Sequence, residues 1–119
     1  MSRITFSRQQ HSISVYTSEG ELIGTWDAYN NTGAGVAGFP NGTYSFAWYN
    51  PHAAASAGSA TGSYGIFIFN VPGRNGLGIH SGRSGPASPT NGCIRTTDDG
   101  MHQINGTHLG DPLTEITVQ

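Results

Sequence analysis

The chain has 119 residues, which suits one small domain, and we expect a single domain over residues 1–119. Its five basic residues are all arginine, seven residues are acidic and the net charge is −2, so the chain lacks the positive field that binds nucleic acids or anionic membranes. No stretch reaches the roughly 18 apolar residues of a membrane helix, whereas 18 glycines and only 10% charged residues favour turns and short strands.

The first part of the sequence has the pattern of a β-hairpin. Residues 11–16 alternate polar residues with Ile13 and Val15, which is the period of a half-buried strand. Residues 17–20 favour a turn, and residues 22–29 again have the composition of a strand. We therefore expect two antiparallel strands here.

Two further strands are expected in the middle of the chain. Tyr44, Phe46 and Trp48 fall on one face of a strand over residues 43–49, just after an Asn-Gly turn signal. Residues 65–70 form a continuous apolar run of strand length. Such a run suits a central strand that is covered on both faces.

The remaining segments combine loops, a short helix and a final strand. Residues 51–63 are rich in Ala, Ser and Gly, and we expect a mobile surface loop there. Residues 77–80 have the pattern of a strand end. Thr97 can cap a helix with an acidic first turn, and an Asn-Gly pair is expected to end that helix near Ile104. With a closing strand over residues 115–118, the sequence predicts a mainly β domain with one or two short helices.

The single cysteine has the neighbours of a reactive thiol. Cys93 follows Gly92, whose conformational freedom lets backbone N–H groups converge on a developing oxyanion. His80 lies upstream across a loop and can fold back as the base that a nucleophilic cysteine needs. Arg95 offers a planar fork for a substrate carboxylate. An inert core Cys93, with Arg95 in solvent or paired with nearby carbonyls, explains the same residues, and spacing alone leaves both interpretations open.

The sequence contains no motif for a zinc site or for a papain-like peptidase. A structural zinc site needs four ligands, usually with paired close spacings, and His102 and His108 lack such a pattern, so no metal is expected. Papain-like peptidases place the cysteine before the histidine, whereas His80 precedes Cys93 here.

The order of these elements resembles the L,D-transpeptidase (YkuD-type) family. That family carries an Ile-His-Gly or Ile-His-Ser element, a variable loop and a Ser/Thr-His-Gly-Cys-x-Arg/Asn run, to which residues 78–82 and 92–95 are similar. Residues 7–10, 39–44 and 110–114 are similar to its opening hairpin, its Pro-Thr-Gly-Thr-Tyr turn and its closing Gly-Thr-Pro-Val element. The resemblance spans nearly the whole chain and implies an L,D-transpeptidase-like β-sandwich.

The resemblance also implies roles for particular residues. It implies that Cys93 is the nucleophile, that His80 is its base and that Ser81 helps to orient His80. The backbone N–H groups of Gly92 and Cys93 would meet the oxyanion, with Asn91 as a further contributor.

Four other residues are candidates for contacts with substrate. Arg95 and Arg83 would bind carboxylates, although a solvated side chain explains Arg83 as well. Tyr64 and Trp48 either line the groove or belong to the core. No metal ion or organic cofactor is implied.

The sequence departs from the family pattern at two positions before the cysteine. Asn91 stands where most members have the second histidine of the run, and Thr90 takes the place of the serine. This departure, in a compact domain, is similar to the L,D-transpeptidase-like peptidoglycan-targeting toxins of the type VI secretion system.

The implied activity is acyl transfer on peptidoglycan stem peptides. The thiolate would attack the carbonyl of the third residue and release the terminal D-amino acid, followed by hydrolysis, cross-linking or exchange. Such a substrate places the protein in the periplasm or cell wall. The first residues lack the features of a secretory signal, so we expect either a removed signal or a dedicated secretion apparatus, the latter with an inhibitory partner protein.

Two alternatives remain open from the sequence. One is a catalytically silent module that binds the cell wall or a partner through the same fold. The other is a hydrolase of a different amide or ester that uses the same Cys–His pair.

Overall fold

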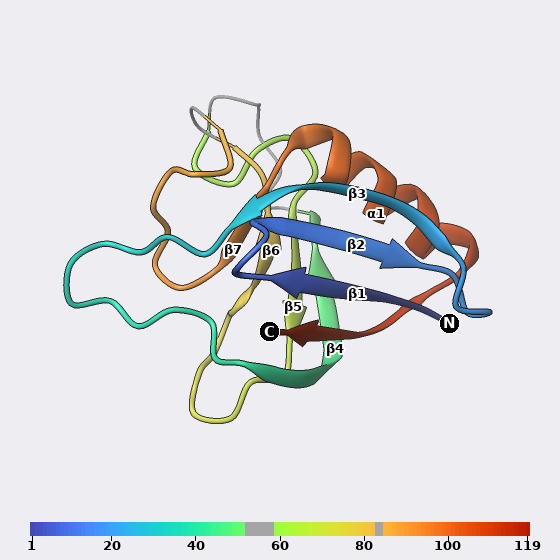
Figure 1. Ribbon diagram of the computed structural model, residues 1–119, viewed down its shortest axis with the longest axis horizontal. Coiled ribbons are helices and arrows are strands. Elements are labelled where there is room, and N and C mark those ends of the chain that lie inside the picture. The colour runs from blue at the N-terminus through green and yellow to red at the C-terminus, as the bar shows by residue number, and fades with distance from the viewer. Residues whose placement is uncertain (52–58, 83–84) are drawn as a thin grey trace.

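The computed structural model describes residues 1–51, 59–82 and 85–119. Their elements are β1 (Ser2–Ser7), β2 (Ser12–Tyr16), β3 (Leu22–Tyr29), β4 (Gly42–Asn50), β5 (Ile66–Phe69), β6 (Gly78–His80), β7 (Ile94–Thr96), α1 (Asp98–Gly110) and β8 (Leu113–Val118). The strands follow the order β1-β2-β3-β7-β6-β5-β4-β8 and close into a barrel, with α1 lying beside β3 (Figure 1).

The mainly β fold with a short helix is confirmed. The two sheets that a sandwich keeps apart are joined here by β3 and β4, because each of these long strands pairs with a different neighbour along each half. The first part of β3 pairs with β2, and its last residues, Ala28 and Tyr29, pair with β7. Strand β4 pairs with β8 from Gly42 to Ser45, and then with β5 from Phe46 onward.

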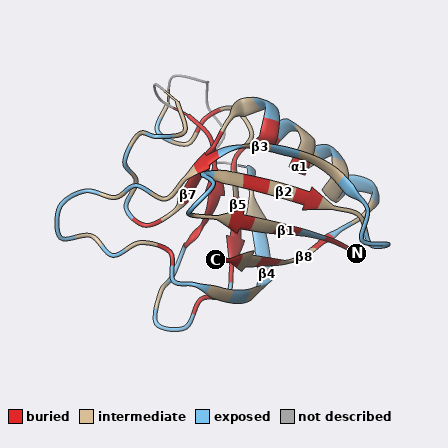
Figure 2. Ribbon diagram, in the orientation of Figure 1, coloured by how far each residue is buried: buried red, intermediate tan, exposed pale blue. Residues whose placement is uncertain are grey.

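Alternating side chains from the strands fill the barrel interior. Strands β1 and β2 each place every second residue inside, and three of the four residues of β5 are buried (Figure 2). The largest fully buried side chains come from all parts of the chain: Phe6, Phe39, Phe67, Phe69, Ile4, Ile13, Ile79, Ile94, Met101, Ile104, Ile116 and Val15. The site described below therefore lies on a rigid wall.

Two strands were not expected from the sequence. The hydrogen-bonded strands β1 and β7 were not predicted, and Cys93 is followed by a strand before the helix begins. The helix begins as predicted, because Thr97 accepts a hydrogen bond from the Gly100 amide. Of the loop expected over 51–63, residues 52–58 lie outside the described residues.

The predicted end of the helix near Ile104 was wrong, since α1 continues to Gly110. Its Asn105 side chain donates to the carbonyls of Met101, one turn earlier, and of Tyr64 in the distant loop before β5. Tertiary packing therefore outweighs the turn preference of the Asn-Gly pair. No helix in the described part of the chain combines the length and apolar character that crossing a membrane requires.

A bulge in β4 changes the direction of one aromatic side chain. Phe46 pairs with Phe69 and Trp48 pairs with Ile68, so the register shifts between Phe46 and Trp48. The expected single aromatic face therefore ends at Phe46, which packs against the core. Trp48 points outward and is 52% exposed.

We expect Ile94, the buried strand residue after the cysteine, to contribute strongly to the stability of the fold. Ile94 is fully buried, so Ile94→Ala should lower the free energy of unfolding by about 2–5 kcal/mol and Ile94→Val by about 0.5–1.5 kcal/mol. Urea unfolding followed by circular dichroism measures both changes. Equal, negligible effects of the two substitutions would contradict the packing described here.

Candidate active site

The single cysteine lies where a tight turn enters β7. Gly92 has a φ of 126°, which an L side chain rarely adopts. A Cβ atom built at Gly92 would also lie 2.5 Å from the Arg74 guanidinium. Only glycine fits this position, and it delivers the half-buried Cys93 to the start of the strand.

The parallel pairing of β6 and β7 brings the sequence-predicted residues together. Ile79 is paired with Ile94, and His80 is paired with Arg95. Registered neighbours in a sheet project to the same face, and faces alternate along a strand. His80 and Arg95 therefore share the outer face of the wall, and Cys93, two residues before Arg95, joins them there.

These side chains line one cavity. Its volume is about 450 Å³, and its lining residues are Gly33, Ala60, Thr61, Ile66, His80, Pro89, Thr90, Asn91, Cys93 and Arg95. The walls come from β5, β6, β7 and from three loops. The structure thus places the predicted nucleophile and base at a single concave site.

A backbone carbonyl orients the histidine. His80 Nδ1 lies 2.8 Å from the carbonyl oxygen of Ser81. A carbonyl can only accept a hydrogen bond, so the proton of the neutral ring sits on Nδ1 and the Nε2 lone pair is available as a base. The expected help from Ser81 in orienting His80 therefore comes from its main chain.

The Ser81 side chain is fixed in turn by the helix. The Ser81 hydroxyl donates to Asp98 Oδ1 at the first residue of α1, and Ser81 is only 1% exposed. Sequence reasoning treated Asp98 only as an acid suited to the helix dipole. Its link to the histidine depends on the packing of α1 against the end of β6, for which the sequence carries no local signal.

Burial favours the neutral forms of both groups. Burial raises the pKa of the Cys93 thiol, although the Gly78 amide and the charges of Arg74 and Arg95 lower it. Burial lowers the pKa of His80, where the Ser81 carbonyl raises it and the charge of Arg95 lowers it further. Burial is the largest influence on each pKa and favours the thiol and the neutral imidazole, and the thiol donates to the Gly76 carbonyl oxygen at 3.6 Å.

Arg95 has the structural role that the sequence left open. It is 2% exposed, and its guanidinium donates to the carbonyls of Ser88, Pro89 and Ala60. These bonds tie the loop before Cys93 to the loop before β5 across the floor of the cavity. Arg83, the other predicted carboxylate ligand, lies outside the described residues.

The predicted oxyanion donors are not equivalent. The Gly92 amide donates to Thr90 Oγ1 at 3.1 Å, so this N–H stabilises the turn itself. The expected oxyanion role of Gly92 stays a prediction, and in this structure its amide is bound to Thr90. Asn91 is exposed and lines the cavity together with Cys93.

An asparagine that sequence analysis passed over supports the turn from below. Asn30 Nδ2 donates to the carbonyl oxygens of Gly92 at 2.8 Å and of Cys93 at 3.0 Å. Its Oδ1 accepts from the Phe39 amide at 2.7 Å and from Arg8 at 2.9 Å. Every polar atom of the amide is used, and Asn30 fixes the backbone of Gly92 and Cys93.

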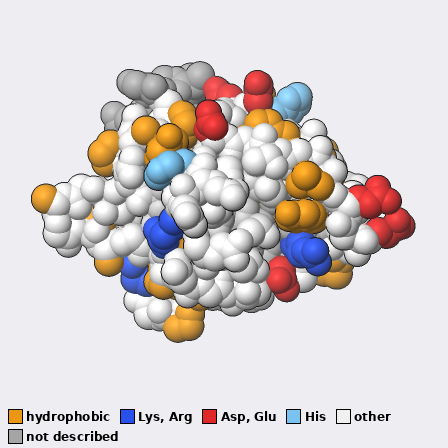
Figure 3. All heavy atoms as spheres, in the orientation of Figure 1, with side chains coloured by type: hydrophobic (Ala, Val, Ile, Leu, Met, Phe, Trp, Pro, Cys, Tyr) orange, Lys and Arg blue, Asp and Glu red, His pale blue; other side chains and the backbone are white. Residues whose placement is uncertain are grey.

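The described residues hold no group of three or more His, Cys, Asp or Glu side chains that could bind a metal ion. On the face shown in Figure 3, charged side chains cover only a small part of the surface. Tyr64 does not line this cavity but stacks on His102 and contacts the core.

A model of the L,D-transpeptidase catalytic domain family (YkuD) matches residues 1–110. No curated protein sequence matches the chain. Several solved structures have the same fold, and three of them illustrate the likeness.

An L,D-transpeptidase of Xylanimonas cellulosilytica (residues 123–326) is 15% identical, with a TM-score of 0.69 over 99% of this chain and 60% of that one. L,D-transpeptidase 1 of Mycobacterium tuberculosis is 17% identical, with a TM-score of 0.66 over 98% of this chain and 60% of the other. Bd1075 of Bdellovibrio bacteriovorus is 18% identical, with a TM-score of 0.72 over 99% and 47%. The chain thus spans about half to three fifths of these structures.

The burial of Cys93 predicts that its thiol loses its proton at a higher pH than an exposed thiol. Because burial raises the pKa of Cys93, the thiolate should form only at a higher pH in the folded protein than in the unfolded one. Iodoacetamide labelling followed over pH in native and in urea-unfolded protein measures the two midpoints. A native midpoint below the unfolded one would instead indicate a resting thiolate–imidazolium pair.

The hydrogen bonds of Ser81 predict that Asp98 controls the tautomer of His80. Asp98→Ala should release Ser81 and reduce the Nδ1-protonated population of His80, whereas Asp98→Asn keeps an accepting oxygen and should preserve it. Nitrogen-15 NMR shifts of the ring report the tautomer. Asp99→Ala removes the same charge from the same helical turn at an exposed position and is the matched control. An unchanged tautomer in Asp98→Ala would contradict the link.

Proposed function

The chain belongs to the L,D-transpeptidase catalytic domain (YkuD) family, and from that membership we propose that it catalyses cysteine-dependent acyl transfer on peptidoglycan stem peptides. The bond attacked is the one between the L-configured centre of the third residue and the terminal D-amino acid. Cys93 is the nucleophile and His80 is the general base.

One observation carries this proposal: Cys93 and His80 share a cavity on one face of the β6–β7 wall. A cysteine nucleophile needs a base on its own side of the site, with a free lone pair. The bond between His80 Nδ1 and the Ser81 carbonyl leaves that lone pair on Nε2. The geometry therefore supports these two residues as nucleophile and base.

The neutral pair leads to a stepwise account of the reaction. As sulfur attacks the substrate carbonyl, Nε2 of His80 takes the thiol proton and an S–C bond forms. The tetrahedral intermediate then collapses, the C–N bond breaks, and the imidazolium returns the proton to the leaving amine. A thioacyl-enzyme and a free D-amino acid result. Because the ion pair exists only during the reaction, no thiolate needs to be stabilised at rest.

The negative charge on the intermediate needs hydrogen-bond donors at the turn. We assign this role to the Cys93 amide and to the side chain of Asn91, since the Gly92 amide is bound to Thr90. Asn91 stands where most members of the family carry a histidine, and an amide Nδ2–H can donate without a change of protonation.

The acceptor decides the product. Water gives an L,D-carboxypeptidase, the side-chain amine of a second stem gives a cross-link, and a free D-amino acid gives exchange. All three share the first half-reaction, so the residues above serve each of them. We place the reaction in the periplasm or cell wall, where peptidoglycan lies.

The Thr90-Asn91-Gly92-Cys93 run supports a more specific role by its likeness to secreted L,D-transpeptidase-like toxins. In that role the protein is an antibacterial effector, and the cell that makes it carries an inhibitory partner protein. A catalytically silent wall-binding module is the alternative function.

A defined tetrapeptide muropeptide tests the proposal. The native protein should release the terminal D-alanine and form a thioester that intact-protein mass spectrometry detects. Cys93→Ala should abolish both, and His80→Gln should lower the rate of acylation by about 10²- to 10⁴-fold. Unchanged circular dichroism controls for folding. Binding to peptidoglycan without cleavage by the native protein would favour the silent module instead.

A further inference from the structure

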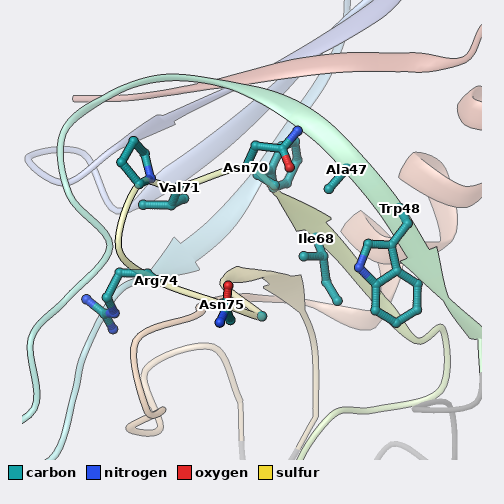
Figure 4. A pocket seen from close by; sticks show the side chains of 10 residues that line it. Ala47, Trp48, Ile68, Asn70, Val71, Arg74 and Asn75 are labelled. Atoms are coloured by element: carbon teal, nitrogen blue, oxygen red, sulfur yellow. The ribbon is translucent and has the colours of Figure 1, made fainter.

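A second cavity opens on the same side of the barrel. Its volume is about 520 Å³, and its lining residues are Ala47, Trp48, Ile68, Phe69, Asn70, Val71, Pro72, Arg74, Asn75 and Gly76. Figure 4 shows Trp48 and Ile68 at one end of this cavity and Arg74 at the other. It is therefore an apolar recess with a guanidinium at its rim.

Strand register places both cavities on one continuous face. Trp48 is paired with Ile68, and Ile68 is paired with Gly78 on β6. On the other side of β6, Ile79 pairs with Ile94 of β7. Since these strands are parallel, Gly78 lies opposite Cys93, each one residue earlier in its chain segment. The row from Trp48 to Cys93 thus crosses four strands without changing face.

Gly78 leaves the space between the two cavities free of a side chain. A Cβ atom at this position would lie 2.2 Å from the carbonyl oxygen of Phe67, so no larger residue fits. Beyond it, the Cys93 thiol reaches the carbonyl of Gly76, which lines the second cavity. Cys93 therefore lines the cavity that holds His80, and its thiol contacts Gly76, a lining residue of the cavity that holds Arg74.

The Arg74 guanidinium is held loosely at this border. It packs against Gly92 and donates to the carbonyls of Ala37 and Gly38, both at 3.3 Å. Among the described residues, no carboxylate lies within ion-pair distance of it. Unlike the deeply buried Arg95, Arg74 is partly exposed and has room for an anionic ligand.

The direction of proton transfer fixes which part of the substrate lies in each cavity. His80 receives the thiol proton and passes it to the leaving amine, so that amine must lie on the His80 side of Cys93. The acyl part of the peptide must then extend away from His80, toward Gly76 and the second cavity.

We propose that the cavity between Trp48 and Arg74 binds the acyl-donor portion of the stem peptide and that Arg74 pairs with a carboxylate of that portion. This inference rests on the proposed function. The apolar wall of Trp48 and Ile68 covers the aliphatic part of the peptide. The planar guanidinium recognises its free carboxylate, which makes Arg74 a specificity-determining residue.

Two matched tetrapeptides test this inference. They differ only in having the carboxylates before the scissile bond free or amidated, and the readout is the kcat/KM of thioester formation by mass spectrometry. The native protein should prefer the free acid by about ten- to a hundredfold, as expected for a charge-assisted hydrogen bond. Arg74→Gln should lose this preference, so that the ratio of kcat/KM between the two peptides falls toward one, and Arg74→Lys should keep part of it.

The controls separate recognition from structure. Arg3→Gln removes the same charge from an exposed arginine on β1 and should leave the preference intact. Trp48→Ala removes an exposed side chain and should raise KM for both peptides without changing their ratio.

An equal loss on both peptides in Arg74→Gln, or a native protein that does not distinguish them, overturns the assignment while Cys93-dependent acylation still stands. If the native protein acylates with neither peptide, the proposed function itself fails, and this inference with it. Should Arg74→Gln not fold, the native acid-to-amide ratio and Trp48→Ala still decide the question.

Discussion

The arrangement of the site depends on one short parallel pairing between β6 and β7. A shift of that register by one residue would turn His80 or Cys93 into the core and bring Ile79 or Ile94 out into water. Both isoleucines are fully buried, so the hydrophobic cost of such a shift is large. The barrel interior thus determines the position of His80 and Cys93 on the outer face of this wall.

The loops around this wall are held by side chains that donate hydrogen bonds to backbone carbonyls. Asn30 fixes the carbonyls of Gly92 and Cys93, and Arg95 fixes carbonyls on both sides of the cavity. Buried carbonyls that lack partners are costly, so removal of either side chain affects several loops at once. Arg95, whose position in the sequence suggests substrate binding, stabilises the backbone here.

The sequence predicted the mainly β class and most strands because these depend on local periodicity. A short motif led to the proposed Cys93–His80 pair, whose two residues the β6–β7 register brings to one face. It did not predict the end of α1, because Asn105 is held by Tyr64 from a distant loop. It also missed the roles of Asn30, Arg74 and Asp98, because each depends on contacts between segments that are far apart in sequence. The role of Arg95 was undecidable from spacing, since the same guanidinium fits a carboxylate or a set of carbonyls, and only burial distinguishes them.

The neutral resting state of Cys93 has a consequence for chemical durability. Oxidation of a cysteine to sulfenic acid proceeds through its thiolate, so a thiol whose proton is retained by burial reacts slowly with peroxides. Cys93 is the only cysteine of the chain, and no second thiol in the chain could rescue it as a disulfide. Under the proposed mechanism Cys93 loses its proton only when substrate fills the cavity, so the resting thiol stays reduced where a permanent thiolate would be consumed.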